Sequence, residues 1–238
     1  MFWRVNKIIM IVKILGISGS PRKNSNTEVL VKEALKGAQS VQNVEVNFFP
    51  LAGKKIGHCL GCLSCEKRQS ICTIKDDFQE FFRVYMEADG IIIGSPVYHL
   101  SITSCLKAAI DRLGQSLFSI YQGKQPRFCK VGGAIAQGNS LYGGQEFTLQ
   151  FIINSFILMN SVVVSGNRPQ SKIGVPLSYP KGQAQFKNKE SDPDLNTIIR
   201  GLGQRVAEMA HIIQTGLEHY HENLGPEYSD KKYQRFIL

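Results

Sequence analysis

The feature that most constrains the fold is a regular alternation of two patterns along most of the chain. Short apolar runs rich in β-branched residues alternate with longer segments whose apolar residues recur at helical spacing. The predicted strands cover residues 11–17, 44–49, 90–94, 130–136 and 161–166, and the predicted helices cover residues 27–38, 78–88, 104–114, 145–159 and 196–219. Alternation predicts a parallel sheet, and continuously apolar strands indicate helices on both of its faces. We therefore expect an α/β fold with a doubly wound, five-stranded parallel sheet in a three-layer sandwich.

The chain of 238 residues is predicted to form a single domain over residues 10–219, because 43% apolar residues supply a sizeable core. Residues 1–9 precede a first strand that already looks complete, so they are either an N-terminal extension or the product of a misplaced start site. Residues 167–194 are rich in Pro, Gly, Lys and Ser, and we interpret them as an insertion before the last helix. Residues 220–238 are a C-terminal tail without a readable pattern.

The formal net charge of +9 comes from dispersed Lys and Arg residues, not from a basic run interleaved with aromatics. With no nucleic-acid motif present, this distribution argues against a nucleic-acid partner and favours a diffuse basic surface that can attract acidic electron carriers. The apolar runs stop short of the roughly 18 residues of a membrane span, and no signal-peptide cleavage site follows the first residues. We expect a soluble, cytoplasmic protein without a membrane partner.

Short polar side chains crowd the turn after the first predicted strand. The turn GISGSPRKNSNT brings Ser18, Ser20, Ser25, Asn26 and Thr27 to the start of the next predicted helix. Backbone N–H groups and the helix dipole favour an anion there, and hydroxyl and amide groups add donors. The dinucleotide pattern GxGxxG and the triphosphate pattern GxxxxGK[ST] are both missing, so we predict a monophosphate site rather than an ordinary helix cap. Arg22 is either a further phosphate ligand or a solvated loop charge.

A second predicted ligand surface follows the third and fourth strands. Ligands of open α/β sheets lie beyond the carboxyl ends of the strands, where the loops after strands one, three and four meet. The contributing residues are Pro96, Val97, Tyr98 and His99 after the third strand, and Gly138, Asn139 and Gly143 after the fourth. The first group offers a flat, partly apolar wall, and the glycines let the backbone approach a planar ring closely.

Four of the six cysteines fall within one short segment. Cys59, Cys62, Cys65 and Cys72 are spaced CxxCxxCx6C. Structural zinc sites usually pair one CxxC with a second pair about a dozen residues away, whereas overlapping CxxCxxC triplets with a later cysteine are typical of iron–sulfur clusters. We favour an iron–sulfur cluster over zinc, and both over disulfides, which a reducing cytosol disfavours.

The cysteine loop, residues 57–76, follows the second predicted strand. If the strand order is 2-1-3-4-5, the loop is expected beside the phosphate turn, at the same edge of the sheet. Cluster and ligand would then be neighbours, either within the chain or across a dimer interface. Asp76 and Asp77 come directly before the next predicted helix, and we interpret them as helix caps.

The segments GISGSPRKNSNT, GSPVYHLSITSCLKAAIDR and QGNSLYGGQE resemble the flavodoxin-like NADPH-dependent FMN reductases over residues 10–165. The resemblance implies that the first segment holds the FMN phosphate and that the other two flank the isoalloxazine. With the cysteine motif added, the chain resembles the iron–sulfur flavoproteins of anaerobic archaea and bacteria. This implies one FMN and one 4Fe-4S cluster per chain, electron transfer between them, and a homodimer or homotetramer.

From this resemblance we expect an FMN-dependent oxidoreductase that couples a ferredoxin-type electron carrier to the reduction of a small oxidant at FMN. One alternative is an NAD(P)H-dependent FMN or quinone reductase whose cysteines bind zinc or nothing. Another is a pure electron carrier or a redox-responsive binding module. No Ser-His-Asp or paired-carboxylate pattern is evident, so we predict no catalytic side chain and leave the chemistry to the cofactors.

Overall fold

The computed structural model describes residues 10–124, 126–127, 129–140, 143–166, 175–178 and 193–228. The strands are β1 (Val12–Ser18), β2 (Val44–Pro50), β3 (Gly90–Pro96), β4 (Val131–Gly138), β5 (Val162–Val163) and β6 (Val175–Ser178). The helices are α1 (Asn26–Gln39), α2 (Ser64–Arg68), α3 (Phe78–Glu87), α4 (Ser104–Tyr121), α5 (Gln145–Leu158) and α6 (Pro193–Tyr220), with 3-10 turns at His221–Asn223 and Pro226–Tyr228. The predicted extension 1–9 and the tail beyond residue 228 lie outside the described residues.

The strands form one parallel sheet in the order β2-β1-β3-β4-β5, which confirms the predicted order. The sheet has one more strand than we predicted, because β6 also pairs with β4. β5 pairs with Val131 and Gly132 at the start of β4, and β6 pairs with Ile135–Gly138 at its end. Two short strands therefore share the fifth position. Part of the predicted insertion 167–194 is thus sheet and the first turn of α6, and its remainder lies outside the described residues.

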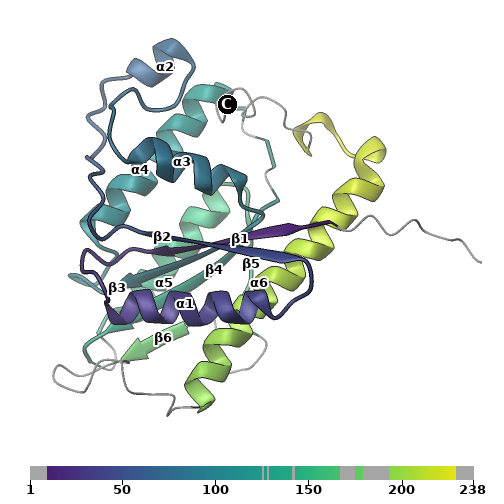
Figure 1. The fold of residues 1–238 in the computed structure, drawn as a ribbon. Coiled ribbons are helices and arrows are strands. Elements are labelled where there is room, and N and C mark those ends of the chain that lie inside the picture. The colour runs from purple at the N-terminus through teal and green to yellow at the C-terminus, as the bar shows by residue number, and fades with distance from the viewer. Residues whose placement is uncertain are drawn as a thin grey trace, which may run out of the picture.

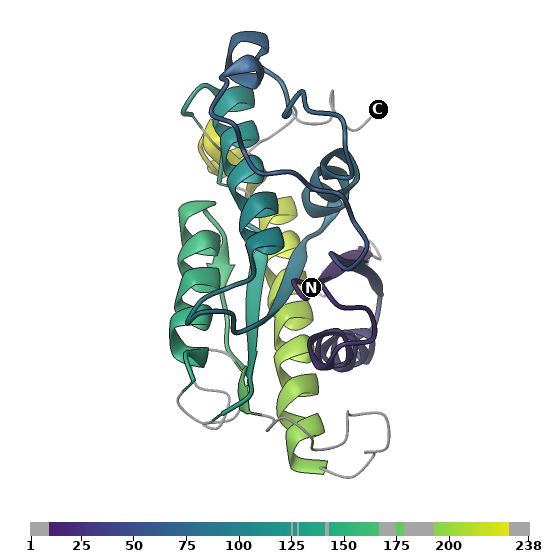
Figure 2. The ribbon, with the colours of Figure 1, turned by 90° about the vertical axis from the view of Figure 1, so that its left-hand side faces the viewer.

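Helices cover both faces of the sheet, which confirms the doubly wound, flavodoxin-like arrangement (Figures 1 and 2). Alternate residues of each strand point to opposite faces. Leu15 of β1 and Ile93 of β3 pack against α3, α4 and α5, whereas Ile14 and Ile92 pack against α1 and α6. The central strands are buried on both sides, which explains their continuous apolar sequences.

Helices α1 and α6 cross closely on the second face, and glycine makes this approach possible. A Cβ atom built on Gly203 of α6 would overlap the carbonyl oxygen of Ala34, and one built on Gly37 of α1 would overlap the carbonyl oxygen of Arg200. An exposed ion pair of 2.9 Å between Arg200 and Glu33 borders the crossing. Among the described residues, no helix is both long and apolar enough to cross a membrane.

Candidate functional site

The loops after β1, β3 and β4 meet at the carboxyl edge of the sheet, as predicted. In register, Ser18 at the end of β1 stands beside Gly94 of β3, and Pro96 stands beside Gln137 of β4. Two backbone hydrogen bonds extend this pairing into the loops: Gly19 N–H donates to the Gly94 carbonyl over 2.7 Å, and Val97 N–H donates to the Gln137 carbonyl over 2.8 Å. The predicted phosphate turn and the predicted ring wall are therefore adjacent.

The phosphate turn contains buried hydroxyl groups, one of which has no partner. Ser18, Ser20 and Thr27 are 2%, 1% and 1% exposed. Ser20 Oγ accepts a hydrogen bond from Arg22 N–H over 3.2 Å. The hydroxyl of Thr27, at the start of α1, is buried without a hydrogen-bond partner. Since an unpaired buried hydroxyl is costly, this atom fits a ligand that accepts its hydrogen bond, as a phosphate at a helix N-terminus would.

The start of α1 is held by a local network. Ser25 is the N-cap residue, and its hydroxyl accepts a hydrogen bond from Glu28 N–H over 3.3 Å. The Glu28 carboxylate in turn accepts from Asn24 N–H over 3.0 Å. Asn26 is half-buried as the first residue of the helix, and Arg22 is exposed. Ser25 thus already performs the capping role, which leaves the deeper hydroxyl of Thr27 for another partner.

The predicted ring wall is a tight exposed turn after β3. Tyr98 and Ser101 exchange two backbone hydrogen bonds, and the residues between them, His99 and Leu100, have positive φ angles of 47° and 66°. Residues other than glycine rarely adopt positive φ angles, and such backbone strain is concentrated at ligand sites. Tyr98 and Leu100 are 43% and 57% exposed, so the turn presents apolar surface at the sheet edge. The sequence reading missed Leu100.

The loop after β4 packs against this turn. Gly138 is buried at the end of β4, Asn139 is exposed, and Gly143 is half-buried. Gly144 has a φ of 104°, and a Cβ atom there would lie 2.9 Å from the Leu100 Cα atom. A larger residue would therefore push the two loops apart. The structure brings the seven predicted ring residues to one edge, of which Pro96 and Gly138 are buried backbone supports.

The four clustered cysteines lie in the loop between β2 and α3, around the short helix α2. All six cysteines of the chain are free thiols; Cys65 is buried, Cys62 is exposed, and Cys59 and Cys72 are half-buried. Hydrogen bonding by Ser64 lowers the pKa of Cys62 and so favours its thiolate. Within the described residues, no three His, Cys, Asp or Glu side chains are grouped as a metal site. The chemistry of the donor set nevertheless fits an iron–sulfur cluster, since four thiols share one short loop.

The position of the cysteine loop corrects one prediction. The loop leaves the sheet at the predicted edge, where Leu51 N–H donates to the Ser18 carbonyl. It then runs along α4, so that Cys72 N–H donates to the Ser116 hydroxyl over 3.0 Å. Thr103, the N-cap of α4, lies at the ligand edge, and Ser116 comes thirteen residues later in the same helix. At a rise of 1.5 Å per residue, Cys72 therefore lies about 20 Å along α4 from the ligand edge. The segment 51–77 has little periodic pattern, so the sequence indicated where the loop starts but not where it goes.

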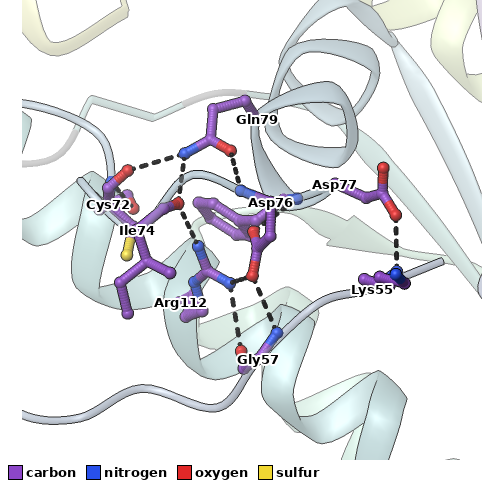
Figure 3. Close-up of polar contacts among 10 residues, drawn as sticks. Lys55, Gly57, Cys72, Ile74, Asp76, Asp77, Gln79 and Arg112 are labelled. Atoms are coloured by element: carbon purple, nitrogen blue, oxygen red, sulfur yellow. Dashed lines mark hydrogen bonds and ion pairs between the residues drawn. The ribbon is translucent and has the colours of Figure 1, made fainter.

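A buried arginine closes the base of the cysteine loop (Figure 3). Arg112 of α4 is 0% exposed, and its Nη1 atom donates to Asp76 Oδ2 over 2.6 Å and to the Gly57 carbonyl over 3.2 Å. Its Nη2 atom donates to the Ile74 carbonyl over 3.0 Å. Asp76 Oδ2 also accepts from Gly57 N–H over 2.9 Å. The chain before Cys59 is thereby tied to the chain after Cys72.

Asp76 therefore does more than the predicted capping. Its Oδ1 atom accepts from Phe78 N–H over 3.0 Å at the start of α3, whereas the Asp77 side chain makes no cap bond and instead accepts from Lys55 N–H over 2.6 Å. The sequence reading missed Arg112. A signal was present, because the arginine occupies a position on α4 that the helical period assigns to the buried face.

The Asp76 carboxyl is predicted to set an acid limit on stability. Burial disfavours its charge, but hydrogen bonds from Arg112, Gly57 and Phe78 more than offset this and lower its pKa. Because the folded-state pKa lies below the unfolded value, the stabilisation is complete above the unfolded pKa and is lost as the pH falls through the folded one. We expect Asp76→Asn to lower the free energy of unfolding at pH 7 by about 3 kcal/mol, because it leaves a buried guanidinium without its counter-charge.

Denaturant titrations between pH 3 and pH 8 measure this effect, and the variant should lose less stability than the wild type on acidification. Asp111→Asn, on the helix that carries Arg112, is the matched control, since its pair with Lys107 is exposed and is expected to contribute less than about 0.5 kcal/mol. Equal losses in the two variants would contradict the role of Asp76.

A doubly wound sheet with a polar turn after β1 that suits an anion, and an exposed apolar turn beside it, defines a flavodoxin-like fold. The comparison with known proteins agrees: residues 12–172 match the NADPH-dependent FMN reductase family, and the chain belongs to it. It is an FMN-dependent oxidoreductase and resembles the iron–sulfur flavoproteins of this family.

One iron–sulfur flavoprotein from Methanocaldococcus jannaschii is 41% identical over 203 residues, covering 85% of this chain and 100% of that protein. One from Archaeoglobus fulgidus is 38% identical over 199 residues, covering 82% and 96%.

Solved structures support the fold. An NADH:FMN oxidoreductase in its apo form matches with a TM-score of 0.57 at 20% identity, covering 85% of this chain and 90% of that one. A WrbA-like flavodoxin from Agrobacterium tumefaciens matches with a TM-score of 0.55 at 16% identity, covering 86% and 99%. At this level of identity the likeness concerns the fold alone.

Proposed function

We propose that the chain binds FMN and a 4Fe-4S cluster and couples single-electron transfer from a ferredoxin-type carrier to the reduction of a small oxidant at FMN. The observation that carries this proposal is the CxxCxxCx6C set of free thiols in a loop closed at its base by Asp76 and Arg112. The relatives named iron–sulfur flavoprotein support it. When bound, FMN supplies two-electron chemistry and the cluster supplies one-electron chemistry.

The residues of the chain bind and orient these groups. Ser18, Ser20, Arg22, Ser25, Asn26 and Thr27 are proposed to hold the FMN phosphate. Pro96, Val97, Tyr98, His99, Gly138, Asn139 and Gly143 are proposed to hold the ring, and Cys59, Cys62, Cys65 and Cys72 to ligate iron. The buried hydroxyl of Thr27 fits the phosphate, and the exposed turn around Tyr98 fits the ring. Cys72 also lines an open hollow of about 750 Å³, which leaves room beside one of the four thiols.

The geometry favours electron exchange between subunits. Within one chain the predicted cluster loop lies far along α4 from the ligand edge, and electron tunnelling weakens steeply with distance. A homodimer or homotetramer that brings the cysteine loop of one chain to the ligand edge of another would remove this separation. Helix α5 supports such an assembly, because it exposes the large apolar side chains of Phe147, Ile157 and Leu158.

The proposed electron carrier would meet a basic and apolar surface on the cysteine loop. Leu60 and Leu63 are 63% and 48% exposed beside the exposed Cys62. Lys67, Arg68 and Lys75 are also exposed. An acidic protein of the ferredoxin type fits this combination, since opposite charges steer the encounter and exposed apolar side chains supply contact area.

The alternative is an NAD(P)H-dependent FMN or quinone reductase without a cluster. The family match favours it, because that family is described by NADPH-dependent FMN reduction. In that case the cysteines bind zinc or remain free thiols, and NAD(P)H reduces the flavin directly.

Metal and flavin analysis of the anaerobically purified protein separates these functions. We expect near-stoichiometric FMN with about four iron and about four sulfide per chain in the wild type. Cys62→Ser should lose most of the iron and keep FMN, because the phosphate turn lies on other elements. Cys105→Ser is the matched control outside the motif and should keep both. FMN with zinc, or with no metal, would overturn the cluster and support the plain reductase.

A further inference from the structure

We propose that Arg112 is a positioning residue of the iron–sulfur site, which fixes Cys72 by closing the cysteine loop and stabilises the reduced cluster with a buried positive charge. This inference rests on the proposed function, because it concerns the cluster. It assigns a role to a residue outside the cysteine motif, on a helix that the motif does not include.

Cys72 is the cysteine whose backbone is held most directly by neighbouring helices. Its N–H donates to the Ser116 hydroxyl of α4 over 3.0 Å, and its carbonyl accepts from Gln79 Nε2 of α3 over 3.0 Å. Gln79 also donates to the Ile74 carbonyl over 2.7 Å and accepts from Asp76 N–H over 3.1 Å. The thiol therefore starts from a preset position between two helices.

Arg112 supplies the charge beneath this thiol. Its guanidinium stacks on the Phe78 ring, with 4.3 Å from Cζ to the ring centroid, and its Nε atom is buried without a hydrogen-bond partner. Figure 3 shows Cys72 and Asp76 on opposite sides of the guanidinium. The ion pair thus turns its positive end toward Cys72 and its negative end away from it.

This orientation has a consequence for reduction. When one electron enters the site from the carrier, no bond forms or breaks and the negative charge near Cys72 increases by one. Arg112 keeps its proton throughout, because a guanidinium stays charged in proteins. A fixed positive charge in a buried setting favours the state with more negative charge, and it does so more strongly than an exposed one. Removing the Arg112 charge should therefore make reduction harder, whereas removing the Asp76 charge should make it easier.

The test is a set of variants read by iron content and by the midpoint potential of the cluster in an anaerobic titration with dithionite. Arg112→Met keeps the volume and loses the charge, and we expect its cluster to hold the electron at least tenfold more weakly, a fall of about 59 mV for a one-electron couple. Asp76→Asn should shift the potential upward. Arg112→Lys keeps the positive charge but cannot bond Gly57, Ile74 and Asp76 together as the guanidinium does. We therefore expect this variant to bind less iron, while the midpoint potential of the cluster that remains stays close to the wild-type value.

Lys75→Gln is the matched control, because it removes a positive charge from the same segment at an exposed position. Its potential and iron content should stay at the wild-type values, since solvent screens that charge. Retention of FMN in every variant shows that the fold is intact. Opposite shifts in the Arg112→Met and Asp76→Asn potentials support the proposal, because a purely structural role would not reverse sign.

Wild-type iron content together with wild-type potentials in Arg112→Met and Asp76→Asn would overturn the inference and leave the proposed function standing. A wild-type protein without iron would overturn the proposed function itself. If the Arg112 and Asp76 variants lose iron but keep FMN while Lys75→Gln keeps both, the result supports the role of Arg112 in closing the loop. The role of its charge in stabilising the reduced cluster is then withdrawn.

Discussion

Replacing Gly203 with alanine is expected to lower the free energy of unfolding by about 3 kcal/mol, at the upper end of the usual cost of overpacking. The added methyl group would overlap the carbonyl oxygen of Ala34 on α1. A backbone atom cannot rotate away as a side chain does, so α1 and α6 must separate and lose packing along their whole contact. Chemical denaturation followed by circular dichroism measures the change.

The same helix provides the control for this substitution. Apart from its chain neighbours and the backbone of α6 itself, no heavy atom of the described residues lies within 4 Å of a Cβ atom built on Gly216. Gly216→Ala should therefore raise the free energy of unfolding by up to about 1 kcal/mol, because alanine is the better helix former. Gly37→Ala, on the other side of the crossing, should resemble Gly203→Ala. The double variant should cost less than the two single effects combined, since the helices need to separate only once. A stabilised Gly203→Ala protein would contradict the close crossing.

Replacing Thr27 with valine is expected to have opposite effects on the FMN-free and FMN-bound protein. The Thr27 hydroxyl is buried without a partner, so an isosteric methyl group should raise the free energy of unfolding of the FMN-free protein by about 1 kcal/mol. The same change removes the hydroxyl that we propose donates to the FMN phosphate. Hydrogen bonds to charged groups contribute about 2 kcal/mol, so FMN should bind about thirtyfold more weakly.

Fluorescence titration of FMN and denaturation of the FMN-free protein test the two halves separately. Thr103→Val is the contrasting control, because the Thr103 hydroxyl is also buried but is fully used. It donates to the Gly19 carbonyl over 2.6 Å and caps α4 by accepting from Leu106 N–H over 3.3 Å. Its loss should lower the free energy of unfolding by about 1 kcal/mol. Unchanged FMN affinity in Thr27→Val would remove Thr27 from the phosphate site.

The central architecture was predictable because its signals are local and repeated. Continuous apolar strands such as Gly90–Pro96 and the helices between them follow from burial on both faces, and the strand order agrees with the structure. The polar start of α1 was predictable for a similar reason, since short polar residues are favoured at helix N-termini, whereas the phosphate ligand of this turn stays a prediction. Which of them caps the helix was not predictable, because Ser25 and Thr27 are equivalent by composition and differ only in depth.

The cysteine loop shows where sequence reasoning stopped. The spacing of the four cysteines indicated an iron–sulfur cluster, yet the loop was placed beside the phosphate turn, and the structure carries Cys72 along α4 instead. Its path depends on long-range bonds from Arg112 to Gly57, Ile74 and Asp76, which join residues up to 55 positions apart. Such bonds produce almost no local sequence pattern, and the one sign of them here is a single arginine, Arg112, on the buried face of a helix.

The divided edge of the sheet separates changes in chain length from the ligand site. Between Val163 of β5 and Val175 of β6 the chain advances twelve residues, while the paired strand β4 advances three, from Gly132 to Ile135. The chain therefore leaves the sheet after β5 and rejoins it at β6, and additional residues between these two strands do not interrupt the pairing of β4. The pairing of Ile135–Gly138 with β6 does not depend on how long that detour is. Evolution can lengthen, shorten or replace the segment between these two strands without moving the ends of β1, β3 and β4, where we propose that FMN binds.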